Sequence, residues 1–381
     1  MELKLTEYEL GELLIYEQPT AYIVNSTEYS DSYKTPVLTA GKSFILGYTN
    51  ETDNIFGKLP VILFDDFTTA TQFVNFKFKV KSSAMKILNV NTESVNPKYI
   101  FYRMQTIQFD HSTHKRYWIQ QYSKLKVQIP PIVEQERIVA KIEELFSDLD
   151  NAVETLKATK AQLKLYKQAV LKSAFSRCIE LKKAEDLCFF ITKGTTPKKA
   201  EFQLEDKSIP FIKVYNLTFD GSLDFTIEPT FIAKSIHETS LGRSIVYPGD
   251  VLMNIVGPPM GKVSIVPSSY DEWNINQAIA RFRCKEELNN RYLAYFLMSS
   301  ETVEKMSKQT KATAGQFNLT LETCRNIDIP VCSINEQLKI VDNLDTQLTA
   351  YNNIEKTVND ALQQATSMRQ SILKQAFEGR L

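Results

Sequence analysis

Histidine is the first residue type to consider for chemistry, because its side chain binds metals and transfers protons near neutral pH. The sequence contains only three histidines, and two of them, His111 and His114, lie three positions apart. A helix would place such a pair on one face, where both could bind a metal ion. No third ligand follows at a suitable spacing, so no metal site is predicted, and a surface loop is the alternative interpretation.

Two other segments come close to nucleotide-binding or methyl-transfer motifs. Ala40–Ser43 matches the end of a phosphate-binding loop, but Pro36 stands where that loop needs its first glycine. Gly257-Pro258-Pro259 lacks the preceding Asn or Asp and the following aromatic residue of an amino-methyltransferase motif. No catalytic residue is therefore predicted, and the sequence favours a chain that is not an enzyme. A nuclease site dispersed along the chain stays an alternative.

A basic and aromatic cluster, Lys115-Arg116-Tyr117-Trp118, directly follows His114. Lys and Arg bind phosphates and aromatic rings stack on bases, so the cluster favours contact with nucleic acid. An ordinary surface loop is again the alternative.

The composition is typical of a globular chain with two or more domains. It has 381 residues, 43% of them hydrophobic, and its 45 Lys and Arg balance 45 Asp and Glu. A nucleic-acid-binding protein without net charge needs local basic patches. The five cysteines show no C-x-x-C spacing, which predicts reduced thiols. The sequence shows no secretory leader and no run of about 18 apolar residues, so a cytoplasmic protein is predicted.

An internal repeat indicates which elements position any binding surface. Residues 134–175 align without a gap with residues 336–377, and both copies open with Glu-Gln and close with Ala-Phe. Apolar residues recur in each copy at alternating spacings of four and three, without Gly or Pro. This pattern predicts two long helices that pair as a coiled coil; an amphipathic helix lying on its own domain is the alternative. The residues predicted to form the seam are Ile138, Ile142, Leu145, Leu149, Leu156, Leu163 and Val170, and Ile340, Leu344, Tyr351, Ile354, Val358, Met368 and Ile372.

Two globules alternate with these helices. Strand patterns occur at 61–64, 73–80, 209–214, 249–254 and 261–266, and short helices are predicted at 96–104 and 289–298. The predicted segments are 1–128 and 179–328 for the globules, and 129–178 and 329–381 for the helices. The shortest closure runs the second helix back toward the first globule. The predicted class is therefore α+β, with two mixed globules separated by two long antiparallel helices and related by a pseudo-two-fold repeat.

A set of short motifs recurs along the chain. It comprises Ile129–Pro131 with Glu134-Gln135 and Ile138, the weaker copy Ile329-Pro330 with Glu336-Gln337 and Ile340, and Leu373–Leu381. The second globule adds Lys193–Pro197, Gly249–Leu252, Gly261–Val263 and Asn276–Ala278. Together these motifs resemble the specificity subunit of type I restriction–modification enzymes, over nearly the whole chain. The first globule departs from that pattern because its start lacks Gly-Thr-Thr-Pro, which leaves its base-contacting residues open.

The resemblance implies a DNA-reading subunit without catalytic residues or cofactors of its own. Each globule would be a target recognition domain that reads half of a bipartite site in the major groove. The helices would dock two methyltransferase subunits, which use S-adenosylmethionine to methylate adenine. Restriction subunits that use ATP and Mg²⁺ would translocate and cut the DNA. A non-catalytic protein-binding scaffold is one alternative, and a single-chain nuclease or methyltransferase is a less favoured one.

Polar loop residues are the predicted DNA contacts, because Asn and Gln suit adenine edges while Lys and Arg suit phosphates or guanine. In the first globule they are Lys42, Tyr48, Thr68, Thr69, Thr71, His114, Lys115 and Arg116. In the second they are Lys193, Thr195, Thr196, Asn216, Asn254, Lys262, Gln277, Lys311 and Gln316. An ordinary loop or capping role is the alternative for each.

Helix length is predicted to set the separation of the half-sites. A helix over residues 134–175 is about 63 Å long at 1.5 Å per residue. Two similar domains at a fixed separation match a duplex site with a spacer of several base pairs.

Overall fold

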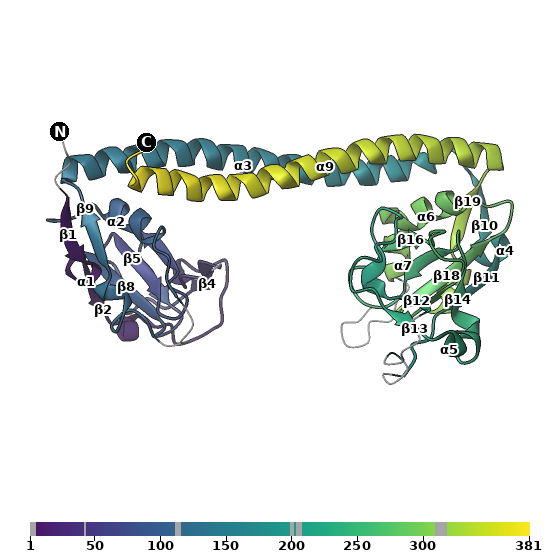
Figure 1. Cartoon of the computed structure of the whole chain (residues 1–381), viewed down its shortest axis with the longest axis horizontal. Coiled ribbons are helices and arrows are strands. Elements are labelled where there is room, and N and C mark those ends of the chain that lie inside the picture. The colour runs from purple at the N-terminus through teal and green to yellow at the C-terminus, as the bar shows by residue number, and fades with distance from the viewer. Residues whose placement is uncertain (1–4, 42, 111–115, 199–201, 203–207, 309–317) are drawn as a thin grey trace. The chain divides into compact units, whose positions relative to one another are not determined.

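Two compact units make up the protein, an α+β chain for which this computed structural model describes residues 5–41, 43–110, 116–198, 202, 208–308 and 318–381. Unit 1 comprises Met1–Lys157 together with Asn359–Leu381, and unit 2 comprises Ala158–Val358. Each unit contains one globule and part of both long helices (Figure 1). This division differs from the four predicted segments, because the two halves of each long helix pack with different globules.

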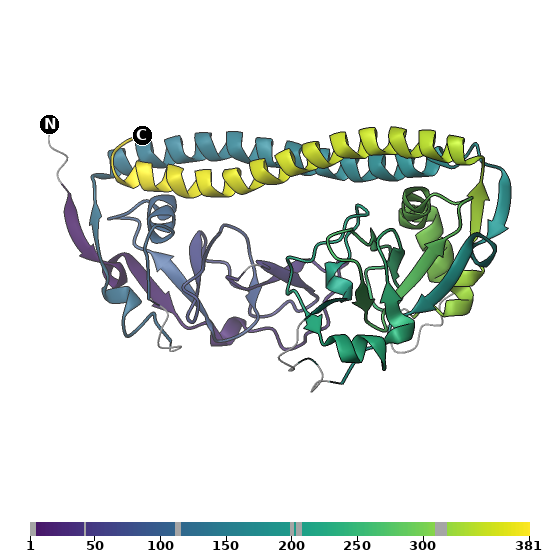
Figure 2. The same cartoon turned by 45° about the vertical axis from the view of Figure 1, so that its right-hand side comes forward.

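The two long helices are α3 (Ile132–Ala174) and α9 (Ile334–Phe377). In unit 1, Ile142 near the beginning of α3 shares a hydrophobic core with Leu373 near the end of α9. In unit 2, Leu171 near the end of α3 shares a core with Leu344 near the beginning of α9. Within each unit the segments of the two helices therefore run antiparallel, as predicted, and these segments lie side by side in both views (Figures 1 and 2).

The globule of unit 1 contains three described sheets. The first sheet pairs β1 (Thr6–Glu9) with β9 (Lys126–Ile129). The second has four strands in the order β2 (Leu14–Glu17), β8 (Met85–Val90), β5 (Val61–Asp65) and β6 (Thr71–Val74). The third has three strands in the order β4 (Ile45–Thr49), β3 (Thr35–Leu38) and β7 (Lys79–Val80). The short helices are α1 (Leu10–Leu13), η1 (Pro19–Tyr22), α2 (Pro97–Met104) and η2 (Tyr122–Lys124). Helix α2 confirms the helix predicted at 96–104.

The single strand predicted at 73–80 is instead divided between two sheets. β6 ends at Val74, and β7 pairs with β3 in the other sheet. Val74, Phe78 and Val80 still point into one hydrophobic core, with Phe76 packed against it. The alternating pattern carried no signal for the step from one sheet to the next, nor for the burial of Lys79 between Phe78 and Val80.

The globule of unit 2 repeats this plan. Its first described sheet pairs β10 (Glu180–Lys183) with β19 (Asp328–Val331). The second has the order β11 (Cys188–Lys193), β18 (Ile279–Cys284), β15 (Val251–Asn254) and β16 (Val263–Ile265). The third has the order β13 (Phe231–Ile232), β12 (Ile209–Ile212), β17 (Trp273–Ile275) and β14 (Ile245–Val246). The short helices are α4 (Ala184–Leu187), η4 (Val214–Asn216), α5 (Lys234–Glu238), η5 (Gly242–Ser244), α6 (Asn290–Met298), α7 (Ser300–Lys308) and α8 (Leu321–Arg325). Helix α6 confirms the helix predicted at 289–298.

The strand pairing shows that the two globules are built alike. In each, a central four-stranded sheet is antiparallel, and a parallel pair (β3 with β7, β12 with β17) belongs to the neighbouring sheet. Unit 2 adds α5, η5 and β14 between β13 and β15, and α7 and α8 after α6. Among the described residues, no helix combines the length and apolar character that crossing a membrane requires.

Candidate nucleic-acid interface

Each long helix holds its globule through a glutamine in its first turn. The buried Gln135 side chain accepts the N–H of Asn96 (2.7 Å) and donates to the carbonyl two residues ahead of α3 (2.8 Å). The buried Gln337 side chain does the same with Asn289 (2.9 Å) and the carbonyl two residues ahead of α9 (3.0 Å). Asn96 and Asn289 in turn cap α2 and α6. The glutamine of the repeated Glu-Gln motif thus joins each long helix to its globule.

In unit 2 the Gly-Thr-Thr-Pro loop after β11 packs against the turn that follows β17. A Cβ atom on Gly194 would lie 2.1 Å from the carbonyl oxygen of Ile275, so only glycine fits there. The N–H of Thr195 donates to that same carbonyl (3.2 Å), and Thr196 Oγ1 accepts the N–H of Gln277 (3.3 Å). Two motifs that are distant in sequence therefore form one surface, called here the paired loops (Lys193–Pro197 and Asn276–Ala278).

An arginine outside every sequence motif, Arg243, extends this surface. Arg243 in η5 is exposed, and its Nε donates to Thr195 Oγ1 (3.4 Å). Lys193, Thr196 and Gln277 of the paired loops are exposed as well. This set of cationic, hydroxyl and amide groups can contact phosphates and base edges. Arg243 lies 48 positions from Thr195 and belongs to no motif, so no sequence signal identified it.

The prediction that Asn216 and Asn254 contact bases is wrong, because both side chains are buried and already hydrogen-bonded. Each is 1% exposed. Asn216 donates to two carbonyls of the following loop, at 2.8 and 3.1 Å. Asn254 closes its hairpin by donating to the carbonyl of Pro259 (3.0 Å) and accepting the N–H of Lys262 (3.0 Å). Both amides hold loops in shape, a role that Asn fills as readily as base contact.

Lys262 itself is half-buried on this hairpin. Its Nζ donates to the carbonyl of Val214 (3.4 Å) and lies 5.8 Å from the centre of the Phe219 ring. The ammonium group is therefore bonded to the unit's own backbone in this structure.

In unit 1 two predicted threonines lie in the turn between β5 and β6. The carboxylate of Asp65 accepts the N–H groups of Phe67 (2.8 Å) and Thr68 (3.0 Å), and Thr69 has a φ of 55°. The Arg116 guanidinium carbon lies 5.9 Å from the centre of the exposed Phe67 ring. An exposed ring beside a cation suits base stacking and phosphate contact. Phe67 was not among the predicted contacts, because exposure cannot be read from an apolar residue type.

The remaining predicted contacts are either half-buried or lie outside the described residues. Tyr48 in β4 and Thr71 in β6 are half-buried strand residues. Lys42, His114 and Lys115 in unit 1, and Lys311 and Gln316 in unit 2, lie outside the residues that the structure describes.

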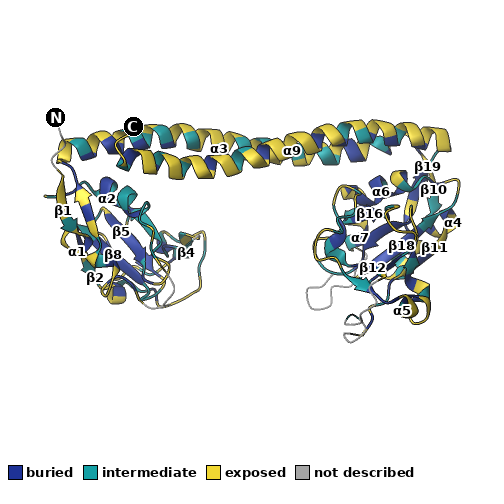
Figure 3. Cartoon of the chain, in the orientation of Figure 1, coloured by how far each residue is buried: buried dark blue, intermediate teal, exposed yellow. Residues whose placement is uncertain are grey.

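The predicted seam residues divide by burial (Figure 3). Ile138, Ile142, Val170, Leu344, Tyr351 and Val358 are buried, and Leu145, Leu149, Leu156, Leu163, Ile340 and Ile372 are half-buried. Ile354 and Met368 are 47% and 54% exposed, so placing them in the seam is wrong. Glu355 and Arg369, one position later, are half-buried instead: Glu355 bonds Tyr351 (2.8 Å), and Arg369 bonds Asp150 (2.6 Å) and lies over the Phe146 ring.

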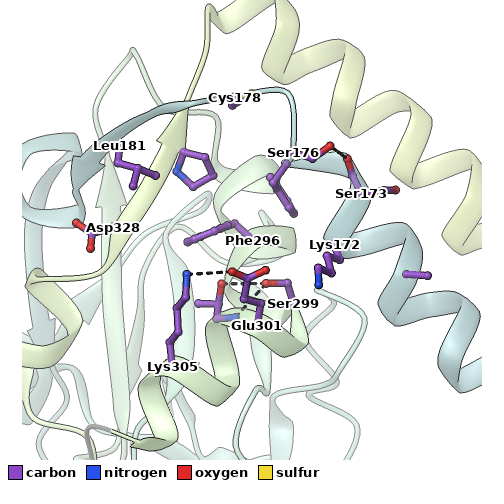
Figure 4. Close-up of a pocket in the computed structure, with 14 residues that line it drawn as sticks. Lys172, Ser173, Ser176, Cys178, Leu181, Phe296, Ser299, Glu301, Lys305 and Asp328 are labelled. Atoms are coloured by element: carbon purple, nitrogen blue, oxygen red, sulfur yellow. Dashed lines mark hydrogen bonds and ion pairs between the residues drawn. The ribbon is translucent and has the colours of Figure 1, made fainter.

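A pocket in unit 2 lies between the end of α3 and helices α6 and α7 (Figure 4). Its lining combines apolar Phe296 and Leu181 with a Lys305–Glu301 ion pair (3.0 Å). No nucleophile paired with a base lines it. Across the described ranges, no group of three or more His, Cys, Asp or Glu residues could hold a metal ion.

Comparisons with known proteins agree on one family. The model of the type I restriction modification DNA specificity domain matches residues 179–364. The EcoR124I/EcoR124II specificity subunit of Escherichia coli is 34% identical over 364 residues, which cover 91% of this chain and 87% of that protein. The EcoBI specificity subunit of Escherichia coli is 28% identical over 327 residues, covering 78% of this chain and 63% of that protein.

Solved structures show the same fold. A chain from a study of complex assembly and conformational transition of the type I R-M system superposes with a TM-score of 0.75, at 19% identity and full coverage of both chains. The HsdS subunit from Thermoanaerobacter tengcongensis superposes with a TM-score of 0.52, at 18% identity, covering 99% of this chain and 97% of that one.

Proposed function

The chain belongs to the family of type I restriction enzyme specificity subunits, and we propose that each of its two units reads one half of a bipartite DNA site. As a specificity subunit it is not catalytic, and the chemistry of the complex lies in partner subunits. The observation that carries the two-half proposal is the duplication: two globules of like strand order, each held by the same buried glutamine. Two related reading domains on one chain match a target with two separate halves.

The proposed contacts are exposed or half-buried polar groups at the loop ends of each globule. In unit 2 they lie on the paired loops, with Lys193, Thr195, Thr196 and Gln277. In unit 1 they lie around the β5–β6 turn, with Thr68, Thr69 and Arg116. Amide and guanidinium groups distinguish bases in the major groove, and lysines bind phosphates.

The proposed partners are two methyltransferase subunits that dock on the helices, and restriction subunits that join them. Support comes from the relatives, which are specificity subunits of type I restriction enzymes, and from the similar solved chain studied in the assembly of the type I R-M system. S-adenosylmethionine would be bound by the methyltransferase subunits, and ATP and Mg²⁺ by the restriction subunits. Because its target is DNA inside the cell, we place the subunit in the cytoplasm.

Methylation mapping tests the proposal. The chain is purified with its methyltransferase partners, and methylated adenines are located on a random-sequence DNA library. We expect methylation only within one sequence that has two fixed halves and an unspecified spacer. Methylation that depends on a single contiguous sequence, or on none, would contradict the proposal.

Two further measurements separate the alternatives. A DNA-binding complex loses affinity steeply with salt because counterions are released from phosphates, whereas a protein-binding scaffold does not. The chain alone, with Mg²⁺ and S-adenosylmethionine, should neither cut nor methylate. The mass of the complex at saturation should correspond to two methyltransferase subunits, and a single copy would contradict the proposed stoichiometry.

A further inference from the structure

An insertion distinguishes the globule of unit 2 from that of unit 1. Between β13 and β15 the chain forms α5, η5 and β14, whereas in unit 1 the corresponding strands β4 and β5 follow one another without such elements. The insertion carries Arg243 to the edge of the paired loops. A segment that only one of two like domains contains is a natural place for a contact that only one half-site needs.

Buried polar groups hold the insertion against the sheet. His237 is fully buried, and its ring nitrogens lie 3.1 Å from the amide of Asn274 and 3.2 Å from the carboxylate of Glu272. The same Asn274 amide donates to the carbonyl of Leu241 (3.2 Å), just ahead of η5. β14, which follows η5, pairs with β17 through Ile245 opposite Asn274. The backbone of Gly242–Ser244 is thus fixed on both sides.

The Arg243 side chain extends from this fixed backbone into an arrangement suited to recognition. Its Nε donates to Thr195 Oγ1, which restrains the plane of the guanidinium group. Within the described ranges no carboxylate forms an ion pair with Arg243, unlike Arg283, which binds Asp250 through two nitrogens at 2.7 and 2.8 Å. Among the described residues, the two terminal nitrogens of Arg243 thus have no ion-pair partner, and their geometry suits a planar acceptor pair.

We infer that Arg243 determines specificity for unit 2 by donating two parallel hydrogen bonds to O6 and N7 of a guanine. The major-groove edge of guanine presents two acceptors with the spacing of the guanidinium fork. Thr195 is the positioning residue, because it holds Nε and leaves the terminal nitrogens to the base. This inference rests on the proposed function and adds a residue and a base to it.

The test compares two substitutions in the complex with its methyltransferase partners. Arg243→Ala removes the side chain, while Arg243→Lys keeps the charge and loses the planar fork. Methylation rates are measured on duplexes in which each base pair of both half-sites is replaced in turn. For both variants we expect the preference for one G·C pair in one half-site to fall roughly 10–100-fold, with the other half-site read as before. Thr195→Val should lower the same preference by a smaller factor.

The controls separate this result from other causes. Arg177→Lys, in the exposed connector after α3, should leave every base preference unchanged. A uniform loss on all duplexes for Arg243→Ala, with recovery in Arg243→Lys, would identify a phosphate contact and overturn the inference. Unchanged base preference in both variants would overturn it as well. If the unsubstituted complex itself ignored half-site substitutions, the proposed function would fail, and that outcome is visible before any variant is made.

Discussion

The two globules share their strand order but differ in the loops that close it. Both are held by a glutamine that bonds the capping asparagine of a short helix, at Gln135 and at Gln337. At the loop ends, unit 1 has a tight turn with a left-handed Thr69, whereas unit 2 has a longer hairpin closed by Asn254. The framework is thus duplicated, and the surfaces that would contact DNA have diverged. This difference suggests that each globule can be changed without the other.

Exchange of one globule should have the largest effect. We expect replacement of residues 179–328 by the globule of a related subunit to change one half of the methylated sequence completely. The other half should stay the same, because unit 1 keeps its own sheets and core. The methylated sequences of the two complexes give the answer, and a change in both halves would show that the globules do not act separately.

A matched pair of helix insertions tests whether the shared framework sets the spacing. Four residues inserted after Thr159 add about 6 Å and a little more than one turn, and four after Ala361 keep the antiparallel partner in register. We expect the spacer to lengthen by about one or two base pairs, since each pair rises about 3.4 Å. The bases read in each half should be unchanged. A folded double insertion that still methylates at the original spacing would exclude the helices as the ruler.

The ion pair Lys86–Asp66 of unit 1 is more deeply buried than the pair Arg283–Asp250 of unit 2, so removing the cation should destabilise the two units to different extents. Lys86 and Asp66 are both 2% exposed with nitrogen and oxygen 3.3 Å apart, whereas Arg283 beside Asp250 is 28% exposed. Lys86→Met should lower the free energy of unfolding by about 3–5 kcal/mol, because it leaves a buried carboxylate without its cation. Arg283→Met should cost less although Asp250 is only 3% exposed, because the partly exposed Arg283 side chain is the one removed and water can approach the carboxylate from its side. Denaturant unfolding measures both.

The exposed Lys58, 3.8 Å from Glu17, provides the control for these substitutions. Lys58→Met should change the unfolding free energy by less than about 1 kcal/mol, as exposed pairs do. Equal losses for Lys86→Met and Lys58→Met would mean that burial does not control the effect.

The smallest expected effect concerns the glutamines that the units share. Gln135→Ala and Gln337→Ala should each cost about 1–3 kcal/mol, because buried backbone groups lose their partners. Gln128→Ala, at an exposed strand position of unit 1, is the control and should cost little. Similar losses at the two glutamines would confirm that the framework is duplicated in energy as well as in geometry. A loss at only one of them would show that one globule is held differently.

The helices and the class of fold could be predicted because they depend on periodicity. The repeat that includes Ile142 and Leu344 indicated two long paired helices, and both residues are buried. The pattern could not show that polar Glu355 and Arg369 take places assigned to Ile354 and Met368. Glu355 is held by a hydrogen bond to Tyr351 on the same helix, and Arg369 by a bond to Asp150 on the other long helix. The pattern of one helix contains no information about the side chains of the other.

The candidate surface was predicted only in part. Thr195, Thr196 and Gln277 were selected from two separate motifs, and the structure brings them together around Gly194, where the backbones approach closely. The sequence could not distinguish an asparagine that closes a loop, such as Asn254, from one that faces solvent, since both occur in polar loops. Arg243 was missed because its significance comes from a contact made across the fold.

The division into units has a consequence for biosynthesis. Unit 2 is one continuous segment, whereas unit 1 consists of two segments, residues 1–157 and residues 359–381. Leu373 and Ala376 fill the core around Ile142, so the earliest-made globule lacks part of its core until the ribosome has added the last turns of α9. The later-made globule can close first, although domains generally fold from the N-terminal end during synthesis. If synthesis stopped shortly after residue 358, the released chain would contain all of unit 2 but only part of unit 1. The apolar side chains of α3 around Ile142 would then be exposed to chaperones and proteases.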